Sequence, residues 1–196
     1  MIRKATAADL DGVADIYEAI LRREGRTGHR YTNWQRGLYP TRATAEKALA
    51  AGTLYVDVRG GEVAAAANLN QVQPDEYAKI PWTIPAKPRE VLVIHTLVVH
   101  PVIAGRGLGR TFAAFAEGLA VGKGCRTIRL DTYEGNLPAI AFYPRLGYRL
   151  AGSAGFHFEG VIDEVLVCFE KALSITGPCS SPPAGPGWGQ GRGRAR

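Results

Sequence analysis

The feature that most constrains the fold is an apolar run over residues 90–100, followed at once by a glycine-rich loop and a helical pattern. The run, EVLVIHTLVVH, lacks the alternation of a strand with one solvated face, so it predicts a strand buried on both faces. Residues 108–122 then carry leucines and phenylalanines at helical spacing. A doubly buried strand needs helices to cover it, which indicates an α/β domain.

The rest of the body alternates between the strand period and the helix period. Turn signals such as Gly60-Gly61 separate the segments, and a polar stretch over 71–89 with four prolines predicts a long loop of the functional kind. The expected order is β-α-α-β-β-β-α-β-α-β-β in one mixed sheet. The expected strands are 2–5, 54–59, 62–70, 90–100, 127–132, 148–158 and 161–171, and the expected helices are 10–25, 41–49, 108–122 and 136–146.

Composition places the chain among soluble globular proteins. Its 196 residues suit one domain, with 46% hydrophobic and 21% charged residues. Neither a signal-peptide pattern nor a membrane-length apolar run is present, so we expect a cytoplasmic protein without a membrane partner. Three widely spaced cysteines support no disulfide framework and no metal site, and we expect reduced, buried thiols.

The C-terminal segment differs in composition from the body. Residues 174–196 are rich in Gly, Pro and Ser and contain little that could form a core, so we predict a domain over 1–173 and a disordered tail over 174–196. The net charge is +6, and three of the arginines behind it lie in this tail. The positive charge of three arginines is too small to indicate a nucleic-acid partner.

The loop after the buried strand has the composition of a phosphate-binding turn. Residues 99–111 read VHPVIAGRGLGRT, and their glycines allow a ligand to approach the backbone where a helix begins. A dinucleotide fingerprint would need glycine in place of Arg110, and no P-loop pattern is present. From the loop alone, a pyrophosphate site and an ordinary glycine-rich turn are both compatible with the sequence.

Two motifs in this region resemble those of the GNAT superfamily of N-acetyltransferases. Val99, Pro101, Gly107 and Gly109 fit the pattern Val-x-Pro, then Arg/Gln-x-x-Gly-x-Gly/Ala, with Ala104 at the Arg/Gln position. A second pattern follows at the expected distance and is carried by Asn136, Ala139, Phe142, Tyr143, Gly147 and Tyr148. The resemblance implies a GNAT-like domain, in which helices flank a mostly antiparallel sheet that is splayed at the cofactor site.

The resemblance also implies a reaction and its donor. We expect transfer of an acetyl group from acetyl-CoA to a small-molecule primary amine by direct attack on the thioester, with pantetheine in the splayed gap and a backbone N–H near Val98 or Val99 polarising the carbonyl. The residues expected to contact the cofactor are Leu97, Val98, Val99, Ala104, Gly105, Arg106, Gly107, Leu108, Gly109, Arg110, Asn136, Ala139, Phe142 and Tyr143.

Acid–base chemistry has three candidate residues. Tyr143 matches the family's general acid, although Pro144 directly after it is expected to disturb the helix there. His95 interrupts the apolar strand, and the two-residue period predicts that it shares a face with Leu97 and Val99, so it is a candidate base. Its alternative is a structural histidine with satisfied hydrogen bonds. Glu90 is the second candidate base.

The acceptor is expected to bind among the loops. Trp34, Tyr39, Tyr77 and Trp82 lie in segments that line the acceptor pocket in this family, where aromatic rings hold apolar or cationic groups. Alternatively, each packs its loop onto the body. Two other functions stay open, a protein or peptide N-acetyltransferase and a non-catalytic sensor of acyl-CoA, and a homodimer is compatible with either.

Overall fold

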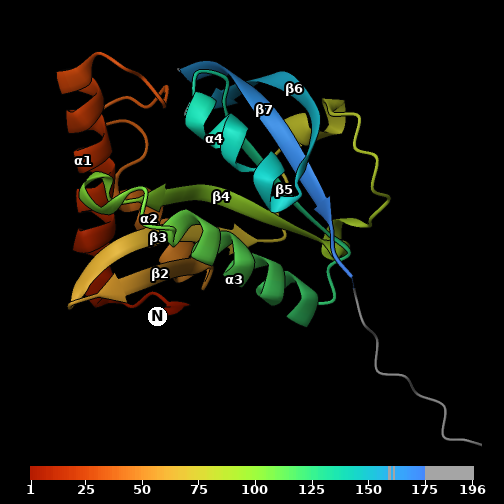
Figure 1. Ribbon diagram of the computed structural model, residues 1–196, viewed down its shortest axis with the longest axis horizontal. Coiled ribbons are helices and arrows are strands. Elements are labelled where there is room, and N and C mark those ends of the chain that lie inside the picture. Colours follow the sequence, from red (N-terminus) through yellow and green to blue (C-terminus); the bar gives the residue numbers. More distant parts are fainter. Residues whose placement is uncertain (159, 161, 175–196) are drawn as a thin grey trace, which may run out of the picture.

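The computed structural model describes residues 1–158, 160 and 162–174, and seven strands of this part form one sheet (Figure 1). The strand order is β1-β2-β3-β4-β5-β7-β6, and every neighbouring pair is antiparallel except β4 and β5. The predicted single α/β domain with a mixed, mostly antiparallel sheet is thereby confirmed. The predicted disordered tail lies outside the described residues from residue 175 onward.

The elements follow the predicted order closely. The strands are β1 (Ile2–Lys4), β2 (Leu54–Arg59), β3 (Glu62–Asn70), β4 (Val91–Val99), β5 (Thr127–Tyr133), β6 (Arg149–Phe158) and β7 (Ile162–Ala172). The helices are α1 (Leu10–Thr27), α2 (Arg42–Ala50), α3 (Leu108–Gly122) and α4 (Leu137–Phe142). The predicted helix over 136–146 is two pieces, because Pro144 cannot donate the next helical hydrogen bond and a 3₁₀ turn (Pro144–Leu146) replaces it.

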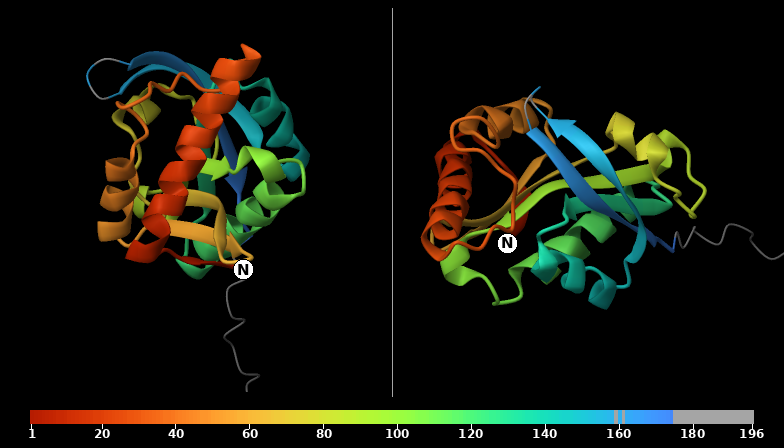
Figure 2. Two further views of the ribbon diagram at one scale, coloured as in Figure 1. Left: turned by 90° about the vertical axis from the view of Figure 1, so that its left-hand side faces the viewer. Right: turned by 90° about the horizontal axis from the view of Figure 1, so that it is seen from above.

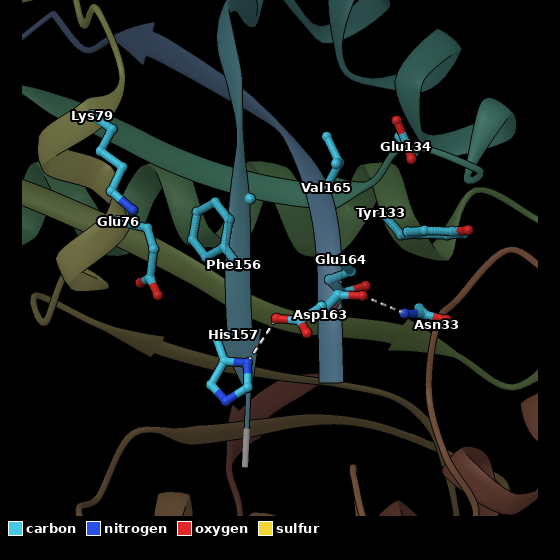
Figure 3. A pocket seen from close by; sticks show the side chains of 11 residues that line it. Asn33, Glu76, Lys79, Tyr133, Glu134, Phe156, His157, Asp163, Glu164 and Val165 are labelled. Atoms are coloured by element: carbon cyan, nitrogen blue, oxygen red, sulfur yellow. Dashed lines mark hydrogen bonds and ion pairs between the residues drawn. The ribbon is translucent and has the colours of Figure 1, made fainter. Parts of the chain in front are cut away.

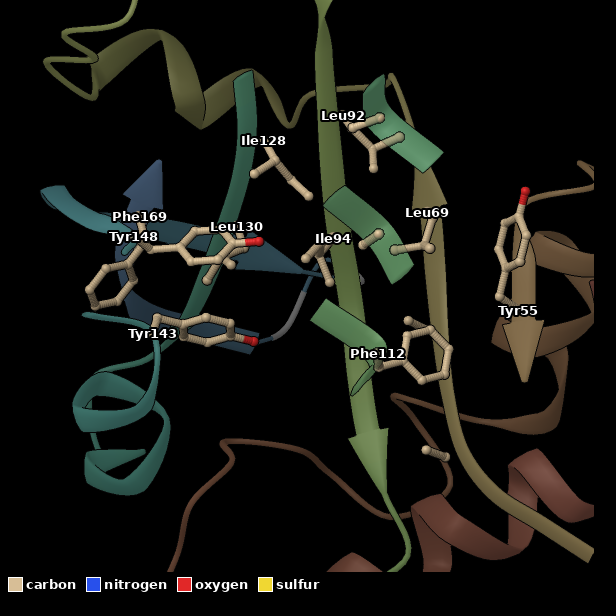
Figure 4. Packing of buried hydrophobic residues seen from close by; sticks show 14 of the residues in the cluster. Tyr55, Leu69, Leu92, Ile94, Phe112, Ile128, Leu130, Tyr143, Tyr148 and Phe169 are labelled. Carbon is tan, nitrogen blue, oxygen red and sulfur yellow. The ribbon is translucent and has the colours of Figure 1, made fainter. Parts of the chain in front are cut away.

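Helices cover both faces of the sheet (Figure 2). On one face, Val13 and Ile16 of α1 pack with Val56 of β2 and Val98 of β4. On the other face, Phe112 of α3 joins buried residues of β3, β4, β5 and β7, a cluster shown in Figure 4. Burial on both faces explains why β4 shows no polar alternation.

The parallel pair β4–β5 is short. Register runs from Val91↔Thr127 to Ile94↔Leu130, and then the two strands separate. The rest of β4 therefore keeps a backbone edge that β5 does not use, while its other edge continues to pair with β3. This is the splayed gap that the resemblance implies, and it lies at the centre of the sheet.

A β-bulge interrupts β4 within this gap. Asn68 of β3 faces His95, whereas Ala66 faces Val98, so two residues of β4 oppose one residue of β3. Thr96 lies in the bulge with a φ of 50°, which is strained for a β-branched residue. The bulge reverses the alternation of side chains beyond it. Contrary to the sequence expectation, His95 does not share a face with Leu97 and Val99, which pack on the α3 side.

The long loop between β3 and β4 is fixed to the sheet by two charged residues. Glu170 of β7 is fully buried and accepts hydrogen bonds from the backbone N–H groups of Thr83 and Ile84. Arg129 of β5 donates to the Ile84 carbonyl and lies 4.3 Å from the centre of the Trp82 ring. Within the loop, residues Asp75–Lys79 form the 3₁₀ helix η2. The loop is therefore a defined part of the structure.

Two further expectations concern the cysteines and the membrane. Cys125 and Cys168 are buried free thiols, as predicted, whereas Cys179 lies outside the described residues. None of the described helices combines the length and apolar character that crossing a bilayer requires.

Candidate functional site

The glycine-rich loop places backbone donors at the start of α3. Gly105 and Gly107 both have φ near +83°, a conformation that favours glycine, and Gly107 is the N-cap of the helix. The N–H groups of residues 108–110 have no acceptor within the helix, because the first turn of a helix lacks preceding carbonyls. Arg106 and Arg110 are exposed at the same point. The loop thus offers N–H donors, the positive end of a helix and two guanidinium groups to an anion.

Two residues of the second motif have structural contacts here. The Asn136 side chain accepts a hydrogen bond from the Ala139 N–H at 3.2 Å and so caps α4. A Cβ placed on Gly109 would lie 3.5 Å from the Phe142 ring, so this glycine lets α4 approach the start of α3. These contacts bring the two motifs together beside the splayed gap.

Tyr143 points into the gap from the end of α4. Its side chain is 7% exposed, and Figure 4 shows the hydroxyl directed toward β4 near Ile94. Among the described residues, none forms a hydrogen bond with this hydroxyl. Burial, with a smaller contribution from the charge of Asp131, raises the pKa of Tyr143 well above its ordinary value. The tyrosine is therefore protonated at neutral pH, and its hydroxyl can act as a hydrogen-bond donor.

The two candidate bases lie in different places. His95 Nε2 lies 3.2 Å from the Asn70 side-chain oxygen and 3.1 Å from the Val72 carbonyl. Burial lowers the pKa of His95, and the Val72 hydrogen bond opposes this shift, so the ring is neutral near pH 7. Glu90 instead precedes β4 at the closed end of the β4–β5 pair and caps a 3₁₀ turn there. It is five residues, about 16 Å of strand, from His95.

A pocket of about 530 Å³ lies across the β6–β7 hairpin, the end of β5 and η2 (Figure 3). Most of its charged lining residues are acidic, namely Glu76, Glu134, Asp163 and Glu164, whereas Lys79 is the lysine among them. The chain as a whole carries a net charge of +6, so the acidity of this surface is local. Such a pocket attracts a cation rather than an anion.

Glu164 lines this pocket, and its charge interacts with that of Asp131, a carboxylate of β5 that does not itself line the pocket. Burial, reinforced by the neighbouring Asp131, raises the pKa of Glu164 to about 7. Burial, reinforced by Glu76 and opposed by a hydrogen bond from the Tyr77 hydroxyl, raises the pKa of Asp131 to about 6. A cation bound beside them would stabilise both carboxylates in their ionised form, because its charge offsets the cost of burying them and their mutual repulsion. Sequence reasoning did not single out either carboxylate, because each stands at an ordinary position of an alternating strand.

The four aromatic residues expected at the acceptor have different surroundings. The Tyr39 hydroxyl lies 3.3 Å from the Thr96 hydroxyl at the bulge, so this loop reaches the gap. Tyr77 is buried and donates to Asp131 at 2.7 Å. Trp82 stacks on Arg129 and donates to the Tyr77 carbonyl, whereas Trp34 packs edge-on against Tyr17 of α1. The structure thus places Tyr39 and Tyr77 beside the gap and gives the two tryptophans packing contacts.

Comparison with known proteins agrees with this geometry. The model of the acetyltransferase (GNAT) family matches residues 13–148. An uncharacterized N-acetyltransferase of Methanocaldococcus jannaschii is 28% identical over 148 residues, which are 75% of this chain and 59% of that protein. Streptothricin acetyltransferase of Streptomyces lavendulae is 31% identical over 88 residues, 45% of this chain and 44% of that protein. The chain therefore spans less than two thirds of the length of either relative.

A solved structure supports the fold independently. A GNAT-family acetyltransferase from Streptococcus agalactiae 2603 superposes with a TM-score of 0.73 at 24% identity, covering 89% of this chain and 95% of that one. The matched family region contains the glycine loop, the splayed strands and the α4 motif, and it spans well over half of the chain. This chain belongs to the acetyltransferase (GNAT) family.

Proposed function

We propose that this protein transfers an acetyl group from acetyl-CoA to the primary amine of a small cationic molecule. The observation that carries the proposal is the pairing of an anion-binding glycine loop with an open gap between β4 and β5 on one side and an acidic pocket on the other. The donor carries negative phosphates and the acceptor is an ammonium ion in water, so each half of the site matches the charge of one substrate.

The donor half has room for the two chemical parts of acetyl-CoA. The pyrophosphate would bind the N–H groups of residues 108–110, with Arg106 and Arg110 at its edge. Pantetheine would pair with the unused backbone edge of Leu97 and Val99 in the manner of an added strand. Ala104, which replaces an Arg or Gln of the family pattern, removes one polar side chain and leaves these backbone donors in place.

The chemistry requires one attack and two proton movements. The amine nitrogen attacks the thioester carbon, the C–S bond breaks, and the thiolate takes a proton from the Tyr143 hydroxyl. A backbone N–H at Val98 or Val99 stabilises the developing oxyanion. The amine loses its proton to a base on the acceptor side, where His95 is one candidate.

The rival functions are distinguished by a panel of acceptors. The rate of free coenzyme A release would be measured with diamines, amino acids, aminoglycosides, neutral monoamines and peptides with a free amino terminus. If this protein acetylates small molecules, small cationic amines should be turned over fastest. The pocket of about 530 Å³ has the size of small-ligand sites, and its lining is mostly acidic. Turnover with peptides alone would support a peptide N-acetyltransferase, and acetyl-CoA binding without turnover on any acceptor would leave a sensor.

A further inference from the structure

We infer that Asp131 is the proton acceptor for the attacking amine, a role that rests on the proposed function. Asp131 is the first residue of β5 beyond the Ile94↔Leu130 pair, at the point where β4 and β5 separate. As a whole residue it is partly exposed. No other carboxylate in the described part of the chain has this position in the register of the two strands.

The carboxylate is held in place yet keeps a free acceptor. The Tyr77 hydroxyl, which belongs to a buried side chain of η2, donates to Asp131 Oδ2 at 2.7 Å. Within the described residues, Oδ1 accepts no hydrogen bond from protein. One oxygen is therefore fixed by the fold and the other is available to a proton from outside it.

Tyr143 supplies an independent indication that a ligand reacts at this point. Its side chain is more than nine-tenths buried, its hydroxyl is unpaired among the described residues, and it is directed into the same gap. Tyr143 enters from the α4 side, whereas Asp131 lies on the face of β5 that carries Tyr77. An acid and a base thus flank the gap from opposite faces of the sheet, as attack by an amine and departure of a thiolate require.

The proton balance of the step is simple. The attacking nitrogen forms a C–N bond, the C–S bond breaks, one proton passes from nitrogen to Asp131 Oδ1, and one passes from Tyr143 to sulfur. Asp131 then releases its proton to water, and Tyr143 recovers a proton from water. No oxidant, reductant or metal takes part.

The groups around Asp131 determine the pH at which its carboxylate titrates. The titratable groups that interact electrostatically with it are Glu76 and Tyr77 of η2, Glu164 and Cys168 of β7, and Tyr143 at the end of α4. His95 of β4 and Arg129 of β5 lie on the same face of the sheet. Tyr77 stabilises the ionised carboxylate, and Glu76 destabilises it. A base in this setting should give kcat/KM an acidic limb near pH 6, the value to which burial raises the pKa of Asp131.

The test compares pH profiles of kcat/KM for coenzyme A release with two amines of different basicity. Asp131→Asn retains an oxygen for the Tyr77 hydroxyl and should lower kcat about 10²–10⁴-fold and remove the limb. Tyr77→Phe should move the limb to higher pH, because it removes a bond that favours the carboxylate, and Glu76→Gln should move it to lower pH. Asp75→Asn, an exposed neighbour of Glu76, is the matched control and should leave rate and limb unchanged.

Thermal melting separates a catalytic role from a structural one. Because the pKa of Asp131 is raised in the folded protein, its ionisation weakens folding as the pH rises from about 4 to above 6. Asp131→Asn should therefore melt at the same or a higher temperature than the wild type at pH 8 while losing activity. A limb that survives Asp131→Asn and disappears in His95→Gln would overturn the inference. If the wild type turned over no amine, the proposed function itself would fail instead.

Discussion

Glu170→Gln should destabilise the fold and, through the loop over 71–90, the proposed acceptor side of the site. Glu170 is fully buried and accepts four hydrogen bonds, from the Thr83 N–H and hydroxyl at 2.8 Å each, from Arg149 at 3.1 Å and from the Ile84 N–H at 3.3 Å. Glutamine keeps one oxygen but not the negative charge, which weakens the two bonds from Thr83 and the bond from the still charged Arg149, and it places an NH₂ group against the Ile84 donor.

The magnitude follows from these four bonds. Weakening three bonds by about 0.5–1 kcal/mol each and leaving one buried donor unpaired at about 1–2 kcal/mol lowers the free energy of unfolding by about 3–5 kcal/mol. For a domain of this size the melting temperature should fall by about 6–20 °C. Glu62→Gln is the control, because this carboxylate of β3 is exposed and its replacement should cost less than about 1 kcal/mol. Calorimetry that finds Glu170→Gln within about 2 °C of the wild type would refute the reasoning.

Three further predictions test other parts of the site. Gly107→Asn should weaken acetyl-CoA binding at least 10-fold, as measured by calorimetry. Gly60 also has a positive φ, in the β2–β3 turn, and Gly60→Asn should leave the affinity unchanged. Equal effects of the two substitutions would exclude the loop from the donor site. Tyr143→Phe should lower kcat about 10²–10⁴-fold with little change in acetyl-CoA affinity, and an unchanged kcat would exclude it as the acid. Deleting residues 175–196 should leave the melting temperature and acetyl-CoA affinity unchanged, because Leu173 still packs on the core, and a large drop would assign the segment a structural role.

Much of the fold was predictable because it depends on local periodicity. The β2–β3 hairpin has the predicted bounds, since alternating residues on both sides of Gly60-Gly61 leave few other arrangements. Helix α3 also begins and ends where glycines were expected to stop regular structure. The proposed donor side follows from the same region, because it consists of one strand, one loop and one helix that are consecutive in the sequence.

The proposed acceptor side was less predictable because it is assembled from distant segments. Asp131 comes from β5, Glu164 from β7 and Glu76 from η2, and nothing in their local sequence marks them as neighbours. Trp82 has an aromatic side chain suited to binding a cation, and it does lie on one, but that cation is Arg129 of the protein itself. Such pairings depend on the register of β5 against β7, which periodicity alone does not fix.

The bulge in β4 shows why the choice of base needed the structure. The run VLVIHTLVV is apolar at nearly every position, so a shift of one residue costs little hydrophobic burial and leaves no sign in the pattern. In a regular strand, Leu97 and Val99 would lie on the same face as His95; the extra residue at Thr96 turns both toward α3 and sends Val98 to the α1–α2 face. His95 consequently stays on the face that carries Asp131 in the parallel register. Asp131 and His95 therefore lie on the same face of the sheet, the face proposed for the acceptor, and the free oxygen of Asp131 at the point of strand separation favours Asp131 over His95.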